Sequence, residues 1–213
     1  MMYSIVKFRA LLAERRHNRQ AGSAFMGMLV GLAIFVIVQR TVVPRYSFVT
    51  PADLAIPFMP LTWAIYVLFF PFVIAVSAYA HEQAFDTFKV AVVVAFMVSI
   101  GCFQLFPEIV PRPDPTSIAN SFLRQRITRL WEVDLPSNGL PSLHVSVTCL
   151  VCRMAWLTRY RWLIGTTGSL ICLSTLTLKQ HTLVDVVAGL LLAGLCAIVA
   201  EKWQQAEVSH GRA

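Results

Sequence analysis

The chain has 213 residues, of which 57% are hydrophobic and only 14% are charged. Soluble domains contain about 45–50% apolar and about 25% charged residues, so this composition argues against an ordinary water-soluble protein and favours a membrane protein. The net charge of +7 is compatible with four roles: binding of nucleic acid, of anionic lipid or of an anionic substrate, and the setting of membrane topology. The positions of the charges must distinguish these roles.

Residues 1–20 alternate apolar and basic side chains, which is typical of a cytoplasmic segment that sets topology and contacts anionic headgroups. These two roles explain the basic residues, so no nucleic-acid partner is expected. The basic residues of this segment used to assign orientation are Lys7, Arg9, Arg15, Arg16 and Arg19.

A membrane-spanning helix needs about 17–25 mostly apolar residues, and six segments meet or approach that length. The sequence therefore predicts an all-α, polytopic integral membrane protein whose six-helix bundle occupies residues 21–200. Six crossings place the N-terminus and the tail 201–213 on the same, cytoplasmic side. The predicted spans are 21–38, 56–80, 90–106, 140–157, 162–178 and 183–200.

The remaining basic residues support this orientation, because Lys89, Arg153, Lys202 and Arg212 fall in cytoplasmic connections or in the tail. The opposite face then holds the connections 39–55, 107–139 and 179–182. We expect a bacterial inner membrane protein in which this second face is directed to the periplasm or the outside.

Two features of the outer connections have more than one interpretation. Residues 122–131 carry apolar side chains at helical spacing between polar ones, which indicates an interfacial helix. In one interpretation its arginines bind anionic lipid over the site, and in the other it is a plain surface helix. Asp53 either caps the helix that follows or contacts substrate. The five cysteines lie in apolar stretches and are expected to be buried thiols.

Polar residues gather where two predicted spans begin on the outer face. Ser142 and His144 open the fourth span, where free backbone N–H groups favour an anion. His181 and Asp185 open the sixth span four residues apart, and therefore on one helix face. An Asp within a span costs about 2.5–3.5 kcal/mol on insertion scales, so it needs a partner, and His181 is within reach.

These residue types suit phosphoryl transfer through histidine. One imidazole attacks phosphorus with a carboxylate behind it, and a second, protonated imidazole gives its proton to the leaving oxygen. Arg112, Lys179 and the hydroxyl of Ser142 can hold the other phosphate oxygens. The dense ligand spacings of metal sites are absent from the sequence, so neither a metal nor another cofactor is expected.

The stretches Pro-Ser-Leu-His at 141–144 and Lys-Gln-His-x-x-x-Asp at 179–185 resemble the second and third motifs of the type 2 phosphatidic acid phosphatase and vanadium haloperoxidase superfamily. Within it, the stretch Phe-Pro-x-x-x-Pro-Arg at 106–112 is most similar to the inositol phosphorylceramide synthase branch. The resemblance covers about residues 53–189.

The resemblance implies that His181 is the phosphohistidine nucleophile, Asp185 its orienting carboxylate and His144 the general acid. Arg112 matches the arginine that ends the first motif, and Ser142 a phosphate ligand. The family's other two basic residues fall here on Leu105 and Thr175. Lys179 is expected to replace one of those charges, and the departures favour the phosphotransferase-like branch.

Two classes of function therefore compete. The first is a metal-independent enzyme that cleaves a phosphate ester or anhydride of a phospholipid or other lipid phosphate at the outer face. Water would make it a phosphatase, and a lipid hydroxyl would make it an inositolphosphotransferase-like enzyme. The second class is a non-catalytic haem or metal carrier, or a transporter, which would not need Asp185, Arg112 and Lys179 beside its histidines.

Overall fold

The computed structural model describes the backbone of residues 2–210 and the side chains of residues 14–207 and 209. The side chains of Lys7 and Arg9, and the whole of Arg212, lie outside the described residues. The chain is all-helical over the part that the structure describes, with two isolated β-bridges in place of a sheet. The α-helices are α1 (Met2–Thr41), α2 (Pro51–Ala55), α3 (Trp63–Val67), α4 (Phe69–Tyr79), α5 (Glu82–Leu105), α6 (Ser121–Val133), α7 (Leu143–Met154), α8 (Arg161–Thr177) and α9 (Leu183–His210), and the short 3₁₀ helices are η1 (Pro60–Thr62) and η2 (Pro115–Ser117).

Four helical segments within the described residues are long and apolar enough to cross a membrane, rather than the six expected. They are Glu14–Thr41, Pro60–Tyr79, Glu82–Leu105 and Leu183–Glu207. The other two predicted spans correspond to α7, with 12 residues, and α8, with 17. At 1.5 Å per residue α7 rises only about 18 Å, well short of a hydrocarbon core of about 30 Å.

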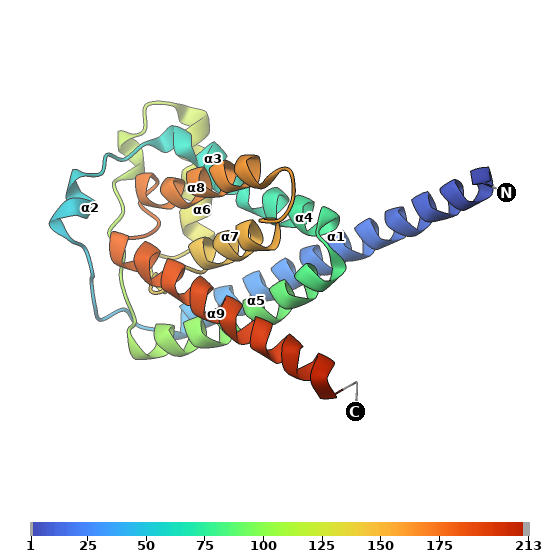
Figure 1. Ribbon diagram of the computed structural model, residues 1–213. Helices are drawn as coiled ribbons and strands as arrows, with labels where there is room; N and C mark the ends of the chain where they lie inside the picture. Colours follow the sequence, from blue (N-terminus) through green and yellow to red (C-terminus); the bar gives the residue numbers. More distant parts are fainter. Residues whose placement is uncertain (1, 211–213) are drawn as a thin grey trace.

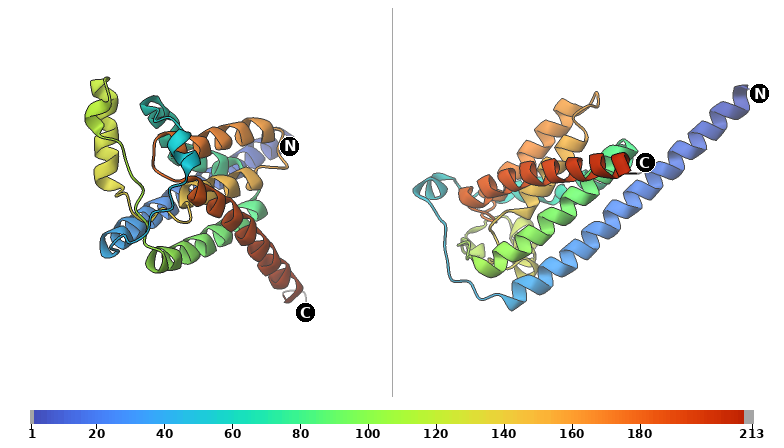
Figure 2. Two further views of the ribbon diagram at one scale, coloured as in Figure 1. Left: turned by 90° about the vertical axis from the view of Figure 1, so that its left-hand side faces the viewer. Right: turned by 60° about the horizontal axis from the view of Figure 1, so that its bottom comes forward.

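The short helix α7 lies inside the bundle, in contact with α4, α5, α8 and α9. Figure 1 shows the long helices α1, α5 and α9 on one side of it and α3 and α8 on the other. Both ends of the described chain lie at one end of the molecule, whereas α2 and the first residues of α7 and α9 lie at the opposite end. Helix α6 stands apart at one side, as the left view of Figure 2 shows.

Small side chains bring α5 and α9 close together. On α9 they recur at helical spacing, and two alanines of α5 belong to the same buried cluster. Small residues let helix backbones approach when lipid supplies no hydrophobic drive for association. The small residues of this cluster on the two helices are Ala91, Ala95, Ala193, Cys196, Ala197 and Ala200.

The outer faces of these helices are apolar, as a lipid environment requires. Met97 of α5 is 69% exposed and Leu191 of α9 is 65% exposed. An exposed apolar surface of this extent is unfavourable in water, whereas lipid solvates it. The described cysteines, Cys102, Cys149, Cys152, Cys172 and Cys196, are all free thiols.

The crossing of α7 over α9 determines where the site lies. The hydroxyl of Ser146 on α7 donates to the carbonyl oxygen of Gly189 on α9 at 2.9 Å. A Cβ atom at position 189 would meet the carbonyl oxygen of Ser142 at 2.7 Å. Only glycine permits this approach, which brings the first turns of α7 and α9 together.

Candidate active site

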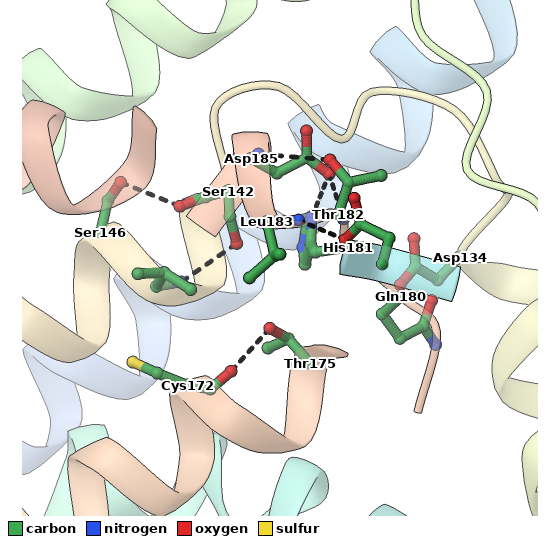
Figure 3. Close-up of polar contacts among 12 residues, drawn as sticks. Asp134, Ser142, Ser146, Cys172, Thr175, Gln180, His181, Thr182, Leu183 and Asp185 are labelled. Carbon is green, nitrogen blue, oxygen red and sulfur yellow. Dashed lines mark hydrogen bonds and ion pairs between the residues drawn. The ribbon is translucent and has the colours of Figure 1, made fainter. Parts of the chain in front are cut away.

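The second and third motifs of the sequence meet at the first turns of α7 and α9. The backbone N–H of Ser142 donates to the carbonyl oxygen of Asp185 at 3.1 Å. Figure 3 shows Ser142 beside Asp185, with His181 and Thr182 on the far side of the carboxylate. Residues about forty positions apart in the chain are therefore parts of one site.

Asp185 holds His181 in place. Its carboxylate is fully buried, and Oδ2 lies 3.3 Å from Nδ1 of His181. The same oxygen accepts from the backbone N–H of Thr182 at 2.8 Å. With Nδ1 turned to the carboxylate, Nε2 of His181 is the nitrogen left for chemistry.

The tight turn before α9 fixes the backbone on which His181 sits. The carbonyl oxygen of Thr175 accepts from the N–H groups of both Gln180 and His181, at 2.9 and 3.2 Å. Lys179 adopts a φ of 56°, a left-handed conformation that non-glycine residues seldom adopt. The backbone strain at Lys179 sits directly beside the histidine.

His144 stacks against two aromatic rings, one from α3 and one from α4. Its ring centroid is 4.4 Å from that of Tyr66 and 3.9 Å from that of Phe69. The buried Nε2 atom of His144 has no hydrogen-bond partner among the described residues. The stacking fixes the plane of the imidazole and leaves this nitrogen available.

Ser142 is the N-cap of α7. Its Oγ atom accepts from the backbone N–H of Val145 at 3.3 Å, and the residue is fully buried. A serine hydroxyl both donates and accepts. The cap uses its oxygen as an acceptor, so the hydroxyl hydrogen is left to donate.

Arg112 is held by oxygen atoms of the chain on both sides of its guanidinium. Nη1 donates to the carbonyl oxygen of Asp134 at 2.5 Å, and Nη2 donates to Oε1 of Gln180 at 2.5 Å. The guanidinium also lies 5.5 Å from the ring of Trp131. Burial lowers the pKa of Arg112, and the nearby carboxylate of Asp134 opposes this shift.

Lys179 and Asp53 join the segment 53–56 to the start of α9. The ammonium of Lys179 donates to the carbonyl oxygens of Asp53 and Ile56 at 2.8 and 2.6 Å. Asp53 forms a capping box with Thr50 at the start of α2, and its Oδ1 accepts from the N–H of Leu183 at 2.7 Å. Asp53 therefore caps α2 rather than the helix of the second predicted span, and it also binds the first N–H group of α9. A contact of Asp53 with substrate stays a prediction.

A large and mostly apolar cavity reaches the two histidines. Its volume is about 1000 Å³, and His144 and His181 both contribute to its wall. From there it continues between α1, α4 and α5 as far as Ser23 and Lys89. Arg112, Ser142 and Lys179 do not contribute to its wall.

A family model described as the PAP2 superfamily matches residues 47–199, which is most of the chain. The chain belongs to the PAP2 superfamily. None of the curated proteins and none of the solved structures with which the chain was compared matches it. PAP2 superfamily members are generally phosphatases or phosphotransferases, so a membrane protein with a phosphatase-type fold is the assignment that the match supports.

The region matched to the PAP2 superfamily contains both histidines and Asp185, but not α1. At the two positions where the sequence departs from the motifs the side chains are uncharged, and the replacement of one of the motifs' charges by Lys179 stays a prediction. Leu105 is 69% exposed, and the hydroxyl of Thr175 donates to the carbonyl oxygen of Cys172 at 2.7 Å, as Figure 3 shows.

One acidic residue of the site was assigned no role from the sequence. Glu108 is fully buried, and a Cβ atom at position 139 would lie 2.8 Å from its Oε2 and 2.9 Å from Oδ2 of Asp185. The two carboxyl groups therefore converge on Gly139. Burial, with the neighbouring carboxyl of Asp185 adding to the effect, raises the pKa of Glu108 to about 9, so it is uncharged at neutral pH.

The segment before α7 supplies further polar residues that the sequence analysis missed. Ser137 and Asn138 are buried and belong to the cavity wall, as does Gln180. Asn138 has a φ of 65°. Asparagine tolerates this left-handed region. The Asn-Gly pair before the motif is therefore the one sequence signal that indicates this turn.

Proposed function

We propose that this protein is a membrane-embedded lipid phosphatase or phosphotransferase that works through a phosphohistidine. The observation that carries the proposal is that His181, which is paired with Asp185, and His144, whose Nε2 has no partner among the described residues, line one cavity with a long apolar wall. The two imidazoles supply a nucleophile and an acid, and the apolar wall suits a lipid.

In the first half-reaction, the lone pair of Nε2 of His181 forms a bond to phosphorus while the bond from phosphorus to the leaving oxygen breaks. Asp185 accepts the hydrogen bond from Nδ1–H, which stays on the ring, and stabilises the positive charge that develops there. Protonated His144 gives its proton to the leaving oxygen.

In the second half-reaction, an acceptor oxygen attacks the phosphohistidine and gives its proton to His144, which frees His181. Water as the acceptor makes the enzyme a phosphatase. A lipid hydroxyl makes it a transferase of the inositol phosphorylceramide synthase kind, which the stretch 106–112 and the neutral residues Leu105 and Thr175 favour.

The charges of the cavity wall support an anionic lipid substrate. Arg126 and Arg129 of α6 both contribute to it, and neither forms an ion pair within the described residues. Together with Leu130 and Val133 they follow the i, i+3, i+4, i+7 spacing of one helix face. This face of α6 presents cations near the phosphate and apolar side chains along the hydrocarbon.

Ser142, Arg112 and Lys179 remain the predicted phosphate-binding residues. Each has capacity to spare beyond the bonds described above. Two of the three ammonium protons of Lys179 are used, and Nε of Arg112 has no partner among the described residues. A phosphate that approaches along the cavity wall would bind these remaining donors.

The test is to trap the intermediate. Purified protein incubated with a ³²P-labelled lipid phosphate and quenched rapidly should carry acid-labile, base-stable label, which is the behaviour of a phosphohistidine. The label should vanish in His181→Ala and persist with excess chelator present. Turnover that survives His181→Ala, or that strictly needs a divalent ion, would end the proposal.

A panel of acceptors separates the two outcomes of the second half-reaction. Phosphatidic acid, a polyprenyl diphosphate, and phosphatidylinositol with ceramide or diacylglycerol are scored for free phosphate against new phospholipid. Release of phosphate alone identifies a phosphatase, whereas new phospholipid identifies a transferase.

We further propose that the cell membrane of a bacterium holds this enzyme with the site directed outward. Arg15, Arg16, Arg153 and Lys202 belong to helix segments directed to the end of the molecule where the chain termini lie, away from the histidines. This distribution matches the positive-inside rule. Fusions of green fluorescent protein and of alkaline phosphatase to the C-terminus test this orientation. With a cytoplasmic C-terminus, the fluorescent protein should fluoresce and the alkaline phosphatase should be inactive.

A further inference from the structure

Buried polar atoms without partners are concentrated around the two histidines. Among the described residues of the site, nitrogen and oxygen atoms lack hydrogen-bond partners on Ser137, Asn138, His144 and Gln180. All four residues contribute to the wall of the same cavity. A buried donor without a partner is unfavourable, so a cluster of them marks the place where a polar ligand binds.

Asn138 is the clearest case. It is 2% exposed, and neither its Nδ2 nor its Oδ1 has a partner within the described residues. It is also held at a φ of 65°, in the left-handed region that few non-glycine residues adopt. The fold thus holds an amide at the cavity wall with nothing from the chain to satisfy it.

Gln180 is oriented by its neighbour. It is 4% exposed, and its Oε1 accepts from Nη2 of Arg112 at 2.5 Å. Because arginine only donates, this contact settles which end of the amide is the oxygen. The Nε2 group, which has no partner among the described residues, is therefore the end that remains for a ligand.

The cations expected to hold phosphate are meanwhile bonded to the chain. Arg112 donates to three backbone carbonyl oxygens besides Gln180, and Lys179 donates to two. Leu105 and Thr175 carry no charge. In contrast to the two cations, neutral side chains of the cavity wall carry donors that have no partner among the described residues, namely those of Ser137, Asn138 and Gln180.

Resting on the proposed function, we propose that Asn138 and Gln180 bind the non-bridging phosphate oxygens through their amide N–H groups, with the hydroxyl of Ser137 as a third donor. Arg112 also positions Gln180 through the bond to its Oε1. The ligand class is a phosphoryl oxyanion, in a cradle whose uncharged amide donors act beside the donors that Arg112 and Lys179 have left.

Two variants test the cradle without disturbing the backbone. Gln180→Glu keeps an oxygen for Arg112 and turns a second oxygen, in place of the N–H group, toward the anion. Asn138→Gly removes the amide yet accommodates the positive φ. Gln83→Glu makes the same charge change at an exposed position near the start of α5 and is the matched control.

The readout is the thermal midpoint of protein in lipid nanodiscs, titrated with inorganic phosphate and separately with orthovanadate. A ligand that binds only the folded state raises the midpoint with its concentration, and the titration gives an apparent Kd. We expect the apparent Kd to rise at least about tenfold in Gln180→Glu and by a smaller factor in Asn138→Gly. It should not change in Gln83→Glu.

Wild-type affinity in both Gln180→Glu and Asn138→Gly would overturn the cradle while leaving the phosphohistidine proposal intact. The absence of any anion-dependent shift in the wild type would overturn both. The midpoints without anion report whether each variant folds, and should Gln180→Glu not fold, Asn138→Gly decides alone.

Discussion

The backbone N–H of Ser142 donates to the carbonyl oxygen of Asp185, and a Cβ atom at position 189 would press against the carbonyl oxygen of Ser142. His144 lies on the first turn of α7, and His181 lies two residues before α9 begins, so this contact joins the two segments that carry the histidines. Their separation therefore depends on the backbone crossing of α7 and α9 and not only on their side chains.

Gly189→Ala should separate these helices and lower kcat at least about tenfold, because the reacting groups lose their alignment. The unfolding midpoint should fall less steeply than activity. Gly194→Ala on the same helix is the control, since a Cβ atom there meets nothing within 4 Å and alanine favours a helix by about 1 kcal/mol. Equal turnover in the two variants would contradict the role of the crossing.

His144→Ala should show a loss of activity that depends on the leaving group. With a lipid phosphate the loss should be about 10²–10⁴-fold, the usual contribution of general acid catalysis. With p-nitrophenyl phosphate the loss should be much smaller, because p-nitrophenolate leaves without a proton. Steady-state kinetics on both substrates measures the ratio, and a common loss factor would remove His144 from this role.

Glu108→Gln should change how stability depends on pH. The folded state keeps the Glu108 proton up to about pH 9, whereas the unfolded chain releases it near its ordinary pKa of about 4.3. The unfolded state therefore binds fewer protons between these values, and wild-type stability falls as pH rises through this window.

Glutamine removes this dependence and still offers an N–H donor beside Asp185. The midpoint of Glu108→Gln minus that of the wild type should thus increase from pH 5 to pH 9. Glu132→Gln, which removes an exposed carboxylate of α6, is the matched control and should give a flat difference. A flat difference for Glu108→Gln as well would show that the buried carboxyl is charged at neutral pH.

Lys179→Gly separates the structural from the binding role of this ammonium. Glycine accommodates the φ of 56°, so any defect reports the lost side chain. We expect a lower unfolding midpoint, because two hydrogen bonds to the connection 53–56 are lost, and a raised KM for a lipid phosphate. A KM equal to the wild-type value would make Lys179 purely structural.

The sequence predicts the helical class, the family and the approach of His144, His181 and Asp185, because motif spacing and hydrophobic runs are local properties. It does not predict that α7 is a 12-residue internal helix. An apolar run looks the same whether lipid or neighbouring helices surround it, and only the packing of α4, α5, α8 and α9 around α7 distinguishes the two.

The contacts of Arg112 and Glu108 could not be predicted from the sequence either. Arg112 bonds to Gln180, 68 positions away, and Glu108 approaches Asp185 only because a glycine at position 139 leaves room for both carboxyl groups. Such contacts depend on how connections fold over the helix ends, and no periodicity in the chain encodes them.

The cavity is built from two parts of the chain, one inside and one outside the matched region. Its polar end belongs to the segment matched to the PAP2 superfamily, while much of its apolar wall comes from α1, which precedes that segment. Substitutions at positions such as Gly27, Val30 and Ile34 should therefore change the length and width of the cavity without moving His144 or His181. On the proposed function, exchange of this one helix would change which lipid binds and leave the chemistry unchanged.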